Sequence, residues 1–198
     1  MLEVLTGSGL ALSAGLNAFI PLLMMGVLAR FTDVIVLPEQ WAWLANEWVL
    51  VVFAVLLLLD VIADKVPAVD HLNDVVQTLV RPTAGGIVFA AGSSSETPAI
   101  TDPGEFFTSA AVWPFIFGLV LALTTHLAKA SGRAVVNLST AGIGAPVVST
   151  VEDVSSLTLT VLAILVPLMV VVFLLAMVAL ALWARSIRAR RRQARWTG

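Results

Sequence analysis

The stretch DHLNDVVQTLVRP, residues 70–82, decides how the rest of the chain is interpreted. At about 100° per residue, its polar side chains fall within roughly a 100° arc and apolar side chains fill the other side. The polar set comprises Asp70, Asn73, Asp74, Gln77 and Arg81. A helix on a membrane surface usually has a Lys/Arg-rich polar face that meets anionic headgroups. This face holds two acids, two amides and a single arginine, so we expect it to line the interior of the protein.

The composition of the chain is that of a membrane protein. Of its 198 residues, 59% are hydrophobic and only 12% are charged, whereas a soluble domain is about half apolar and a quarter charged. Several apolar runs reach the roughly 20 residues that a membrane-spanning helix needs. The first run lacks a basic region before it, so it does not read as a cleavable signal peptide. We expect a single transmembrane domain over residues 1–185.

The apolar runs predict an all-α polytopic membrane protein with six crossings. The expected ranges are 8–30, 48–65, 70–91, 110–129, 134–150 and 155–183. Of these, 70–91 and 134–150 are the least hydrophobic, so each is either a full crossing or a re-entrant hairpin. Glycine and proline interrupt the first and fifth segments, where we expect broken helices. The expected helix breaks are Gly15, Asn17, Pro21, Gly142, Gly144 and Pro146.

Six crossings divide into two halves of three, residues 1–92 and 109–185. An odd number of crossings per half would place the halves in opposite orientations, as in the inverted repeats of many transporters. Pro21 and Pro114 begin similar apolar runs, and Asp60 and Asp153 are separated by the same number of residues. These two matches leave internal duplication and chance both open.

The distribution of basic residues predicts an orientation in a cell membrane. Six of the eleven Lys and Arg residues lie in the segment 183–195, so the tail 186–198 is expected to be cytoplasmic and to meet anionic lipid headgroups. The loops 31–48 and 92–108 contain acids but no Lys or Arg and are expected outside. This assignment places both termini in the cytoplasm. Nucleic acid is not an expected partner, because no accompanying domain could read a duplex.

The chain also carries charges where a membrane should exclude them. An ionisable residue at the centre of a membrane helix costs about 2.5–3.5 kcal/mol, so such residues usually face an interior or a water-filled cavity. Helical spacing places His126, Lys129, Arg133 and Asn137 on one face. We expect an acidic set and a basic set to face each other. The candidate pathway residues are Asp60, Asp64, Lys65, Asp70, Asp74, Arg81, His126, Lys129, Arg133, Asn137, Glu152 and Asp153.

Two interpretations of these charges remain open. They can form a pathway for an ion or solute, with His126 assisting proton coupling, or they can pair with one another and hold the helices together. Hard cations prefer carboxylate oxygens, but Lys65 lies beside Asp64 and would compete, so a metal site is undecided. The chain has no cysteine, P-loop, nucleophile elbow, HExxH or dinucleotide fingerprint. We therefore expect neither an enzyme nor a cofactor.

Three stretches resemble a bacterial family of small membrane proteins known only as domain of unknown function 4126. The stretches are GLNAFIPLL (15–23), ADKVPAVDHLNDVVQTLVRPTAG (63–85) and THLAKASGRAVVNLSTAGIGAPVVSTVED (125–153), about a third of the chain. The family pattern often continues its asparagine with Ser-Pro, whereas Leu138 and Ser139 follow Asn137 here. The resemblance implies a polytopic membrane protein and implies no activity or catalytic residue.

The preferred functional hypothesis is a small secondary transporter or facilitator with a polar site between two helical halves. The first alternative is a lipid scramblase or headgroup-binding flippase, in which the polar groove would open sideways to lipid. The second alternative is a structural or assembly protein with internally paired charges. The expected partners are membrane lipids and a small ion or charged solute, and a homo-oligomer is left open.

Overall fold

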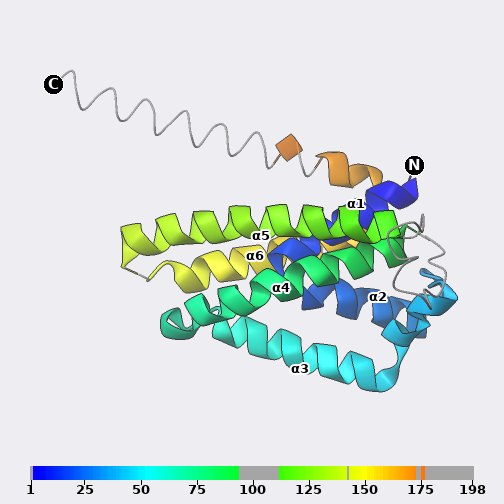
Figure 1. The fold of residues 1–198 in the computed structure, drawn as a ribbon, viewed down its shortest axis with the longest axis horizontal. Coiled ribbons are helices and arrows are strands. Elements are labelled where there is room, and N and C mark those ends of the chain that lie inside the picture. Colours follow the sequence, from blue (N-terminus) through cyan, green and yellow to red (C-terminus); the bar gives the residue numbers. More distant parts are fainter. Residues whose placement is uncertain (1, 94–111, 142, 173–174, 177–198) are drawn as a thin grey trace.

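A computed structural model describes residues 2–93, 112–141, 143–172 and 175–176, and every regular element in these ranges is a helix. The all-α fold class is therefore confirmed. Figure 1 shows the arrangement. The helices are α1 (Leu2–Leu16), α2 (Phe19–Phe31), the 3₁₀ helix η1 (Glu39–Ala45), α3 (Glu47–Ala63), α4 (Pro67–Gly92), α5 (Val112–Thr140) and α6 (Ala145–Leu165).

Helix α1 is the central element of the bundle. It contacts α4, α5 and α6 extensively, while α5 and α6 touch each other only slightly. Helices α4 and α5 lie antiparallel, side by side along most of their length (Figure 1). Helix α3 packs mainly on α2 and η1 and meets α4 near the turn that joins them. From this turn, α3 and α4 diverge like the two arms of a V (Figure 1).

The first apolar run folds as a helical hairpin, which corrects the expected single crossing over residues 8–30. Helix α1 ends at Leu16, and α2 returns toward the end of the bundle from which α1 starts (Figure 1). Thr6 from the start of α1 and Met25 from α2 accordingly line one common pocket. At about 1.5 Å per residue, the helices are roughly 22 and 20 Å long, shorter than the roughly 30 Å hydrocarbon core.

The hairpin turns at Asn17 because the side chain of this residue replaces a missing helical hydrogen bond. Its Oδ1 atom accepts the backbone N–H groups of Phe19 and Ile20 at 3.0 and 3.4 Å, as an N-cap residue does. Gly15 stays within α1, and Pro21 lies in the first turn of α2, where proline is tolerated because the N–H it lacks has no helical partner there. Of the three helix breaks expected in this run, only the one at Asn17 is present.

The hairpin also bears on the expected orientation. The start of α1 lies at the same end of the bundle as the segment 31–48 (Figure 1). The expected cytoplasmic N-terminus and external loop 31–48 rest on a single crossing over residues 8–30, where the structure has two helices.

Residues 134–150 do not form a segment of their own, and the expected fifth crossing is therefore wrong. The first half of this range continues α5 to Thr140, and α6 begins at Ala145. Pro146 lies in the first turn of α6, so it starts a helix instead of breaking one. Ala141 adopts a left-handed conformation with φ of 51° at the turn, beside Gly144. Gly142 lies outside the described residues.

The sixth expected segment, residues 155–183, is divided. Helix α6 already ends at Leu165, just before Pro167, and residues 168–172 are helical again. Two helices of the described part, α5 and α6, are long and apolar enough to cross a membrane. A third span results if η1 and α3, which are bent by 60° relative to each other, act as one.

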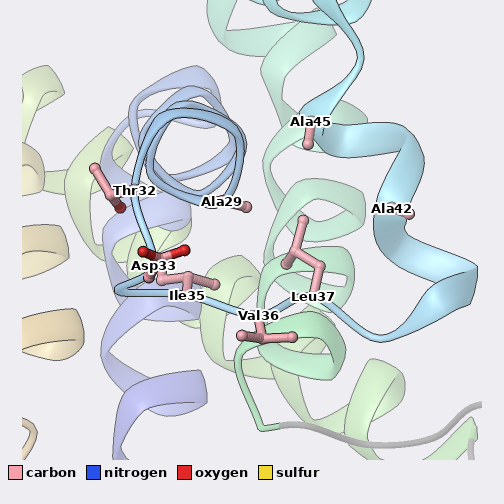
Figure 2. A pocket seen from close by; sticks show the side chains of 8 residues that line it. All are labelled: Ala29, Thr32, Asp33, Ile35, Val36, Leu37, Ala42 and Ala45. Carbon is pink, nitrogen blue, oxygen red and sulfur yellow. The ribbon is translucent and has the colours of Figure 1, made fainter.

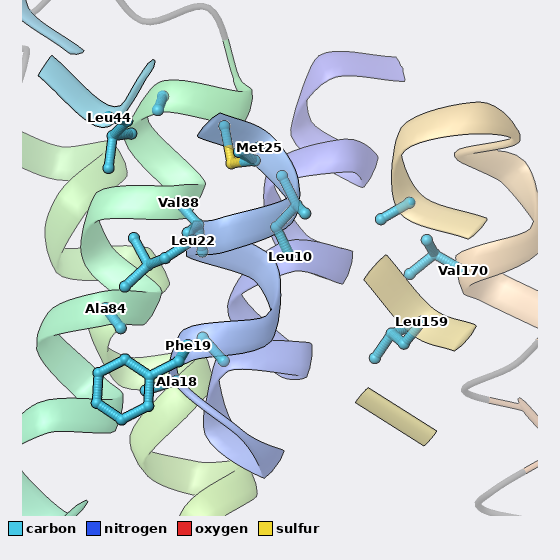
Figure 3. Packing of buried hydrophobic residues seen from close by; sticks show 13 residues of the cluster. Leu10, Ala18, Phe19, Leu22, Met25, Leu44, Ala84, Val88, Leu159 and Val170 are labelled. Carbon is cyan, nitrogen blue, oxygen red and sulfur yellow. The ribbon is translucent and has the colours of Figure 1, made fainter. Parts of the chain in front are cut away.

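The apolar core lies between α1, α2, α4, α6 and η1. Figure 3 shows Leu10, Met25, Val88 and Leu159 within it. Small residues bring the central helices together. A Cβ atom at Gly15 of α1 would lie 2.5 Å from the backbone oxygen of Ala122 in α5. This close approach lets the backbones of α1 and α5 pack directly, as small residues do in membrane helices.

The packing of α5 predicts that glycine-to-alanine substitutions at two of its positions change the stability of the protein in opposite directions. A methyl group at Gly118 would collide with the backbone of Gly85 and with Phe89, whereas nothing lies within 4 Å of one at Gly132. We expect Gly118→Ala to lower the free energy of unfolding by about 1–3 kcal/mol. Gly132→Ala should raise it by up to about 1 kcal/mol, because alanine favours helix. Thermal unfolding of both variants in one detergent checks this, and equal shifts would contradict the packing described.

Candidate functional site

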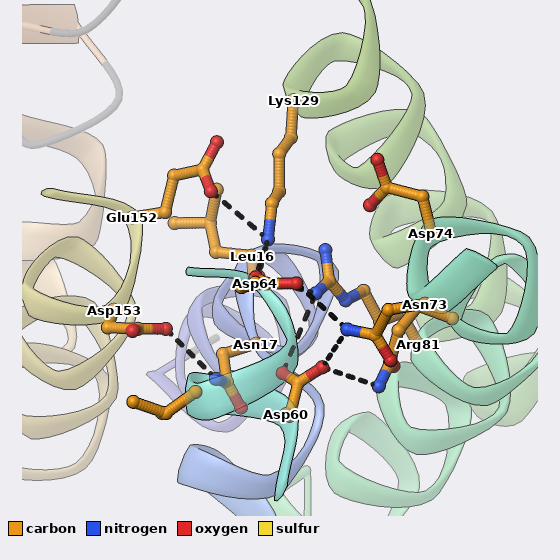
Figure 4. A network of polar contacts seen from close by, with 12 residues as sticks. Leu16, Asn17, Asp60, Asp64, Asn73, Asp74, Arg81, Lys129, Glu152 and Asp153 are labelled. Atoms are coloured by element: carbon orange, nitrogen blue, oxygen red, sulfur yellow. Dashed lines mark hydrogen bonds and ion pairs between the residues drawn. The ribbon is translucent and has the colours of Figure 1, made fainter. Parts of the chain in front are cut away.

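Three carboxylates and three cations form a buried ionic network inside the bundle. The network consists of Asp60, Asp64, Arg81, Lys129, Arg133 and Glu152. Helix α3 and the residue after it supply two acids, α4 one arginine, α5 two cations and α6 the glutamate. All six side chains are buried. Figure 4 shows part of this network around the end of α1.

Asp64, the residue that follows α3, is the hub of the network. Its Oδ2 atom lies 3.1 Å from Arg133, 3.3 Å from Lys129 and 3.7 Å from Arg81. Its Oδ1 atom accepts a hydrogen bond of 2.8 Å from the amide of Asn73. Three cations from two other helices therefore converge on one carboxylate, which neutralises charge that apolar surroundings would penalise.

Asp60 is held mostly by the polar face of α4. Its Oδ1 atom accepts hydrogen bonds of 2.7 Å from both Asn73 and Gln77. Its Oδ2 atom lies 3.6 Å from Arg81 Nη2, an ion pair beyond hydrogen-bond distance. Arg81 is completely buried, and its Nε and Nη2 atoms have no hydrogen-bond acceptor within the described residues.

Lys129 links the network to the broken end of α1. Its Nζ atom donates a 2.9 Å hydrogen bond to the backbone oxygen of Leu16, the last residue of α1. The last carbonyl groups of a helix have no partner within it, so the turn at Asn17 makes this oxygen available. Lys129 also lies 3.2 Å from Glu152, which pairs with Arg133 as well. The helix break is thus part of the site.

A partly exposed rim borders the network. Asn17 donates a 3.0 Å hydrogen bond to Asp153, the neighbour of Glu152 on α6. Lys65, from the turn between α3 and α4, lies 3.8 Å from the other oxygen of Asp153. Because the side chain of Lys65 is 38% exposed, the rim is the accessible edge of the charged region.

His126 lies beside the network on α5. Arg81 can only donate, so its contact with His126 Nδ1 at 3.4 Å makes that ring nitrogen the acceptor. The other nitrogen, Nε2, then donates to Thr78 Oγ1 at 3.1 Å. Thr78 in turn donates to the backbone oxygen of Asp74. A neutral His126 with its proton on Nε2 satisfies both contacts.

Several expected site residues lie outside the network. The Oδ1 atoms of Asp74 and Asn137 are buried and have no hydrogen-bond partner within the described residues. The position of Asp70 is described as part of α4, but its side chain lies outside the described residues. Of the acids among the candidate pathway residues, the described structure brings Asp60, Asp64 and Glu152 against the buried cations.

A cluster of hydroxyl groups between α1 and α6 was not expected. Ser13 lies 2.8 Å from Ser156 and 2.6 Å from Thr160 through the side-chain oxygens, and all three residues are fully buried. The signal was present on α6, where Ser149, Glu152, Ser156 and Thr160 recur at spacings of three and four. On α4, the sequence pattern predicts Asn73 and Gln77 only as part of a polar face.

The charged helices turn their apolar sides outward. On α4, Leu72 and Leu79 are 74% and 77% exposed, while Gln77 and Arg81 face inward. On α3, Leu58 and Leu59 are exposed while Asp60 is buried. A soluble protein has the opposite arrangement. Polar residues inside and apolar residues outside are what a lipid environment favours.

Two pockets of the described residues lie away from the network. One, of about 290 Å³, lies between the end of α2, the following loop and η1, and Figure 2 shows its residues, including Thr32 and Asp33. The other, of about 190 Å³, is lined by residues from the start of α1 and the end of α4. Within the described residues, no group of three or more His, Cys, Asp or Glu side chains is placed to hold a metal ion.

Within the described residues, these features define an all-helical protein that buries an ionic network and exposes many large apolar side chains, an arrangement compatible with a membrane environment. The chain belongs to the family described as "Domain of unknown function (DUF4126)", which it matches over residues 4–186. The expected family is confirmed. No curated protein and no solved structure matches the chain.

The convergence on Asp64 predicts a large cost for removing its charge alone. Asp64→Asn leaves three buried cations facing two carboxylates, and we expect it to lower the free energy of unfolding by about 3–5 kcal/mol. Asp33→Asn, on the exposed loop after α2, should change it by less than about 0.5 kcal/mol. Thermal or denaturant unfolding in detergent measures both variants.

A double variant separates charge balance from packing. Asp64→Asn combined with Lys129→Gln removes one buried charge of each sign from the network. We expect it to be more stable than Asp64→Asn alone, with a coupling of at least about 1 kcal/mol between the two positions. Strictly additive losses would show that the ion pairs are not what stabilises the site.

Proposed function

We propose that the protein is a small secondary transporter or facilitator that moves an ion or small charged solute across a cell membrane. The site would be the buried ionic network with its rim at Lys65 and Asp153. The carrying observation is the hydrogen bond from Lys129 to the backbone oxygen of Leu16. It joins a broken helix to buried charges on other helices, and transporters build ion and substrate sites from such discontinuous helices.

The proposal includes a membrane topology that differs from the one expected from the sequence. In this topology α3, α4, α5 and α6 cross the membrane, and the α1–α2 hairpin enters from the outer side and returns to it. Trp48 at the start of α3 and Trp113 at the start of α5 are 79% and 65% exposed, which suits aromatic side chains at one membrane interface. The turn at Lys65 and the α5–α6 turn then face the cytoplasm. An internal duplication of residues 1–92 and 109–185 stays a prediction.

Single cysteines test this topology directly, because the natural chain contains none. Glu3→Cys and Asp33→Cys should react with an impermeant maleimide in intact cells, since both positions lie at the outer end. Ser139→Cys, near the end of α5, should react only after the cells are permeabilised. Labelling of Glu3→Cys and Asp33→Cys from different sides would exclude the hairpin.

A structural role is the second candidate, and the pairing of the buried charges favours it. Among the described residues, each of the three buried cations lies against at least one of the three carboxylates, as internal pairing requires. The two roles differ in what they predict for the double variant Asp64→Asn/Lys129→Gln. A structural protein would regain its function with its stability, whereas a transporter would regain stability and still lack a binding site.

Transport is tested in proteoliposomes that contain the pH indicator pyranine. The external concentration of sodium, chloride or phosphate is raised, one ion at a time. For at least one of them, we expect the luminal pH to change faster in vesicles with the wild-type protein than in empty vesicles. The double variant, folded to the same extent by its melting curve, should respond as empty vesicles do. Wild-type vesicles that never differ from empty ones, or an equally active double variant, would overturn the transporter proposal.

A further inference from the structure

We propose that Asp60, Gln77 and Arg81 bind one internal water molecule between α3 and α4. Four polar atoms of these residues have no hydrogen-bond partner within the described residues: Asp60 Oδ2, Gln77 Oε1, Arg81 Nε and Arg81 Nη2. All three residues are at most 3% exposed. The inference goes beyond the proposed function, because such a site would serve a transporter and a structural protein alike.

Arg81 presents one edge of its guanidinium group without an acceptor. The Nη1 atom contacts His126 Nδ1 at 3.4 Å. The Nε and Nη2 atoms share the other edge of the planar group, and their N–H bonds point to the same side of it. Buried donors in native proteins almost always have an acceptor, either in the protein or in an ordered water molecule. This edge therefore points to a bound partner that accepts hydrogen bonds.

The two carboxylates nearest to this edge are too far away to be that acceptor. Arg81 Nη2 lies 3.6 Å from Asp60 Oδ2 and 3.7 Å from Asp64 Oδ2 (Figure 4). Polar atoms at such separations often share a bridging water molecule. Two atoms 3.6 Å apart can both reach one water oxygen at hydrogen-bond distance, whereas a larger molecule would have to push them apart. The separation therefore limits the partner to a very small one.

The partner must also donate hydrogen bonds. The Oδ1 atom of Asp60 accepts the amides of Asn73 and Gln77 at 2.7 Å, which leaves Oδ2 without a donor. Gln77 Oε1 is likewise without a donor. Exchanging the amide oxygen and nitrogen of Gln77 would not help, because its oxygen would then face Asp60 Oδ1. Two buried acceptors and one buried donor edge thus meet at the same place.

The charges around this place select a neutral molecule. An anion would lie against Asp60 and Asp64, and a cation would lie against Arg81, with Lys129 also close to Asp64. Within the described residues, no group of three or more His, Cys, Asp or Glu side chains is placed to hold a metal ion. Water is neutral, donates two hydrogen bonds and accepts two. It matches the two donors and the two acceptors of the site.

A bound water molecule would also explain why Arg81 belongs to neither aspartate alone. Internal waters typically make about three hydrogen bonds to buried polar groups that lack other partners. Here the water would accept from the edge of Arg81 and donate to Asp60 and Gln77. The guanidinium would then keep its similar distances from Asp60 and Asp64, because the water supplies the acceptor that neither carboxylate provides.

A crystal structure of the full chain in a lipid phase, grown with rubidium bromide as the salt, tests the site. We expect a density peak about 2.6–3.2 Å from Asp60 Oδ2, Gln77 Oε1 and at least one of Arg81 Nε and Nη2. The peak should show no anomalous scattering from rubidium or bromide. An anomalous peak at this position, or protein contacts that occupy all four atoms, would overturn the inference.

A matched pair of variants tests the part of Gln77. Gln77→Met removes its acceptor at similar length, and we expect the peak to lose occupancy or to move. Gln40→Met, the same exchange in η1, should leave the peak unchanged. Equal occupancy in both variants would show that Gln77 does not hold the water and would overturn the site as proposed.

Nuclear magnetic resonance in detergent keeps the test decisive if the crystals do not resolve water. The chain has three glutamines, Gln40, Gln77 and Gln193, so labelling of glutamine with ¹⁵N gives few side-chain amide signals, and Gln77→Met identifies that of Gln77. We expect direct cross-relaxation between this amide and water, although Gln77 is only 3% exposed. Thr78→Val, which removes a neighbouring hydroxyl at nearly constant size, should retain it. A missing cross-peak, or its loss in Thr78→Val, would overturn the inference.

Discussion

The structure depends on the neutralisation of buried charge inside an apolar chain. Each cation of the network lies against a carboxylate from another helix, and this requirement fixes which side of each helix faces inward. Helix α4 shows the effect most clearly, because its leucines are exposed while Arg81 is fully buried. In water, the same sequence would gain more by burying the leucines. The network is stable only because its members neutralise one another.

The helix break at Asn17 also helps to accommodate the buried charges. An uninterrupted helix would use the carbonyl oxygen of Leu16 for its own hydrogen bonds, and Lys129 would lose one of its three acceptors. Asn17 makes the break inexpensive, because one side-chain oxygen caps α2 while its amide contacts Asp153. A single residue therefore ends one helix, begins the next and connects both to the rim of the charged region.

The sequence predicts the site better than it predicts the path of the chain. The cost of a charge in an apolar segment predicts that Asp60, Asp64, Lys129 and Arg133 face the interior, because such a charge has few favourable positions. The predicted crossings over residues 8–30 and 134–150 are wrong. Hydropathy is summed over a window of residues, so it does not show in which direction the chain continues after a helix ends. Leu16 was not foreseeable as a ligand of Lys129, since backbone oxygens have no sequence signature.

The continuity of α5 follows from the same balance of charges. Residues 129–133 look like a cytoplasmic corner in the sequence, because two cations within five residues normally mark the end of a crossing. In the structure these cations are paired with Asp64 and Glu152, so they need no water and the helix continues to Thr140. A positive charge marks a membrane boundary only where no acid on a neighbouring helix neutralises it. Helix α5 therefore carries its cations within its length, where Asp64 and Glu152 meet them.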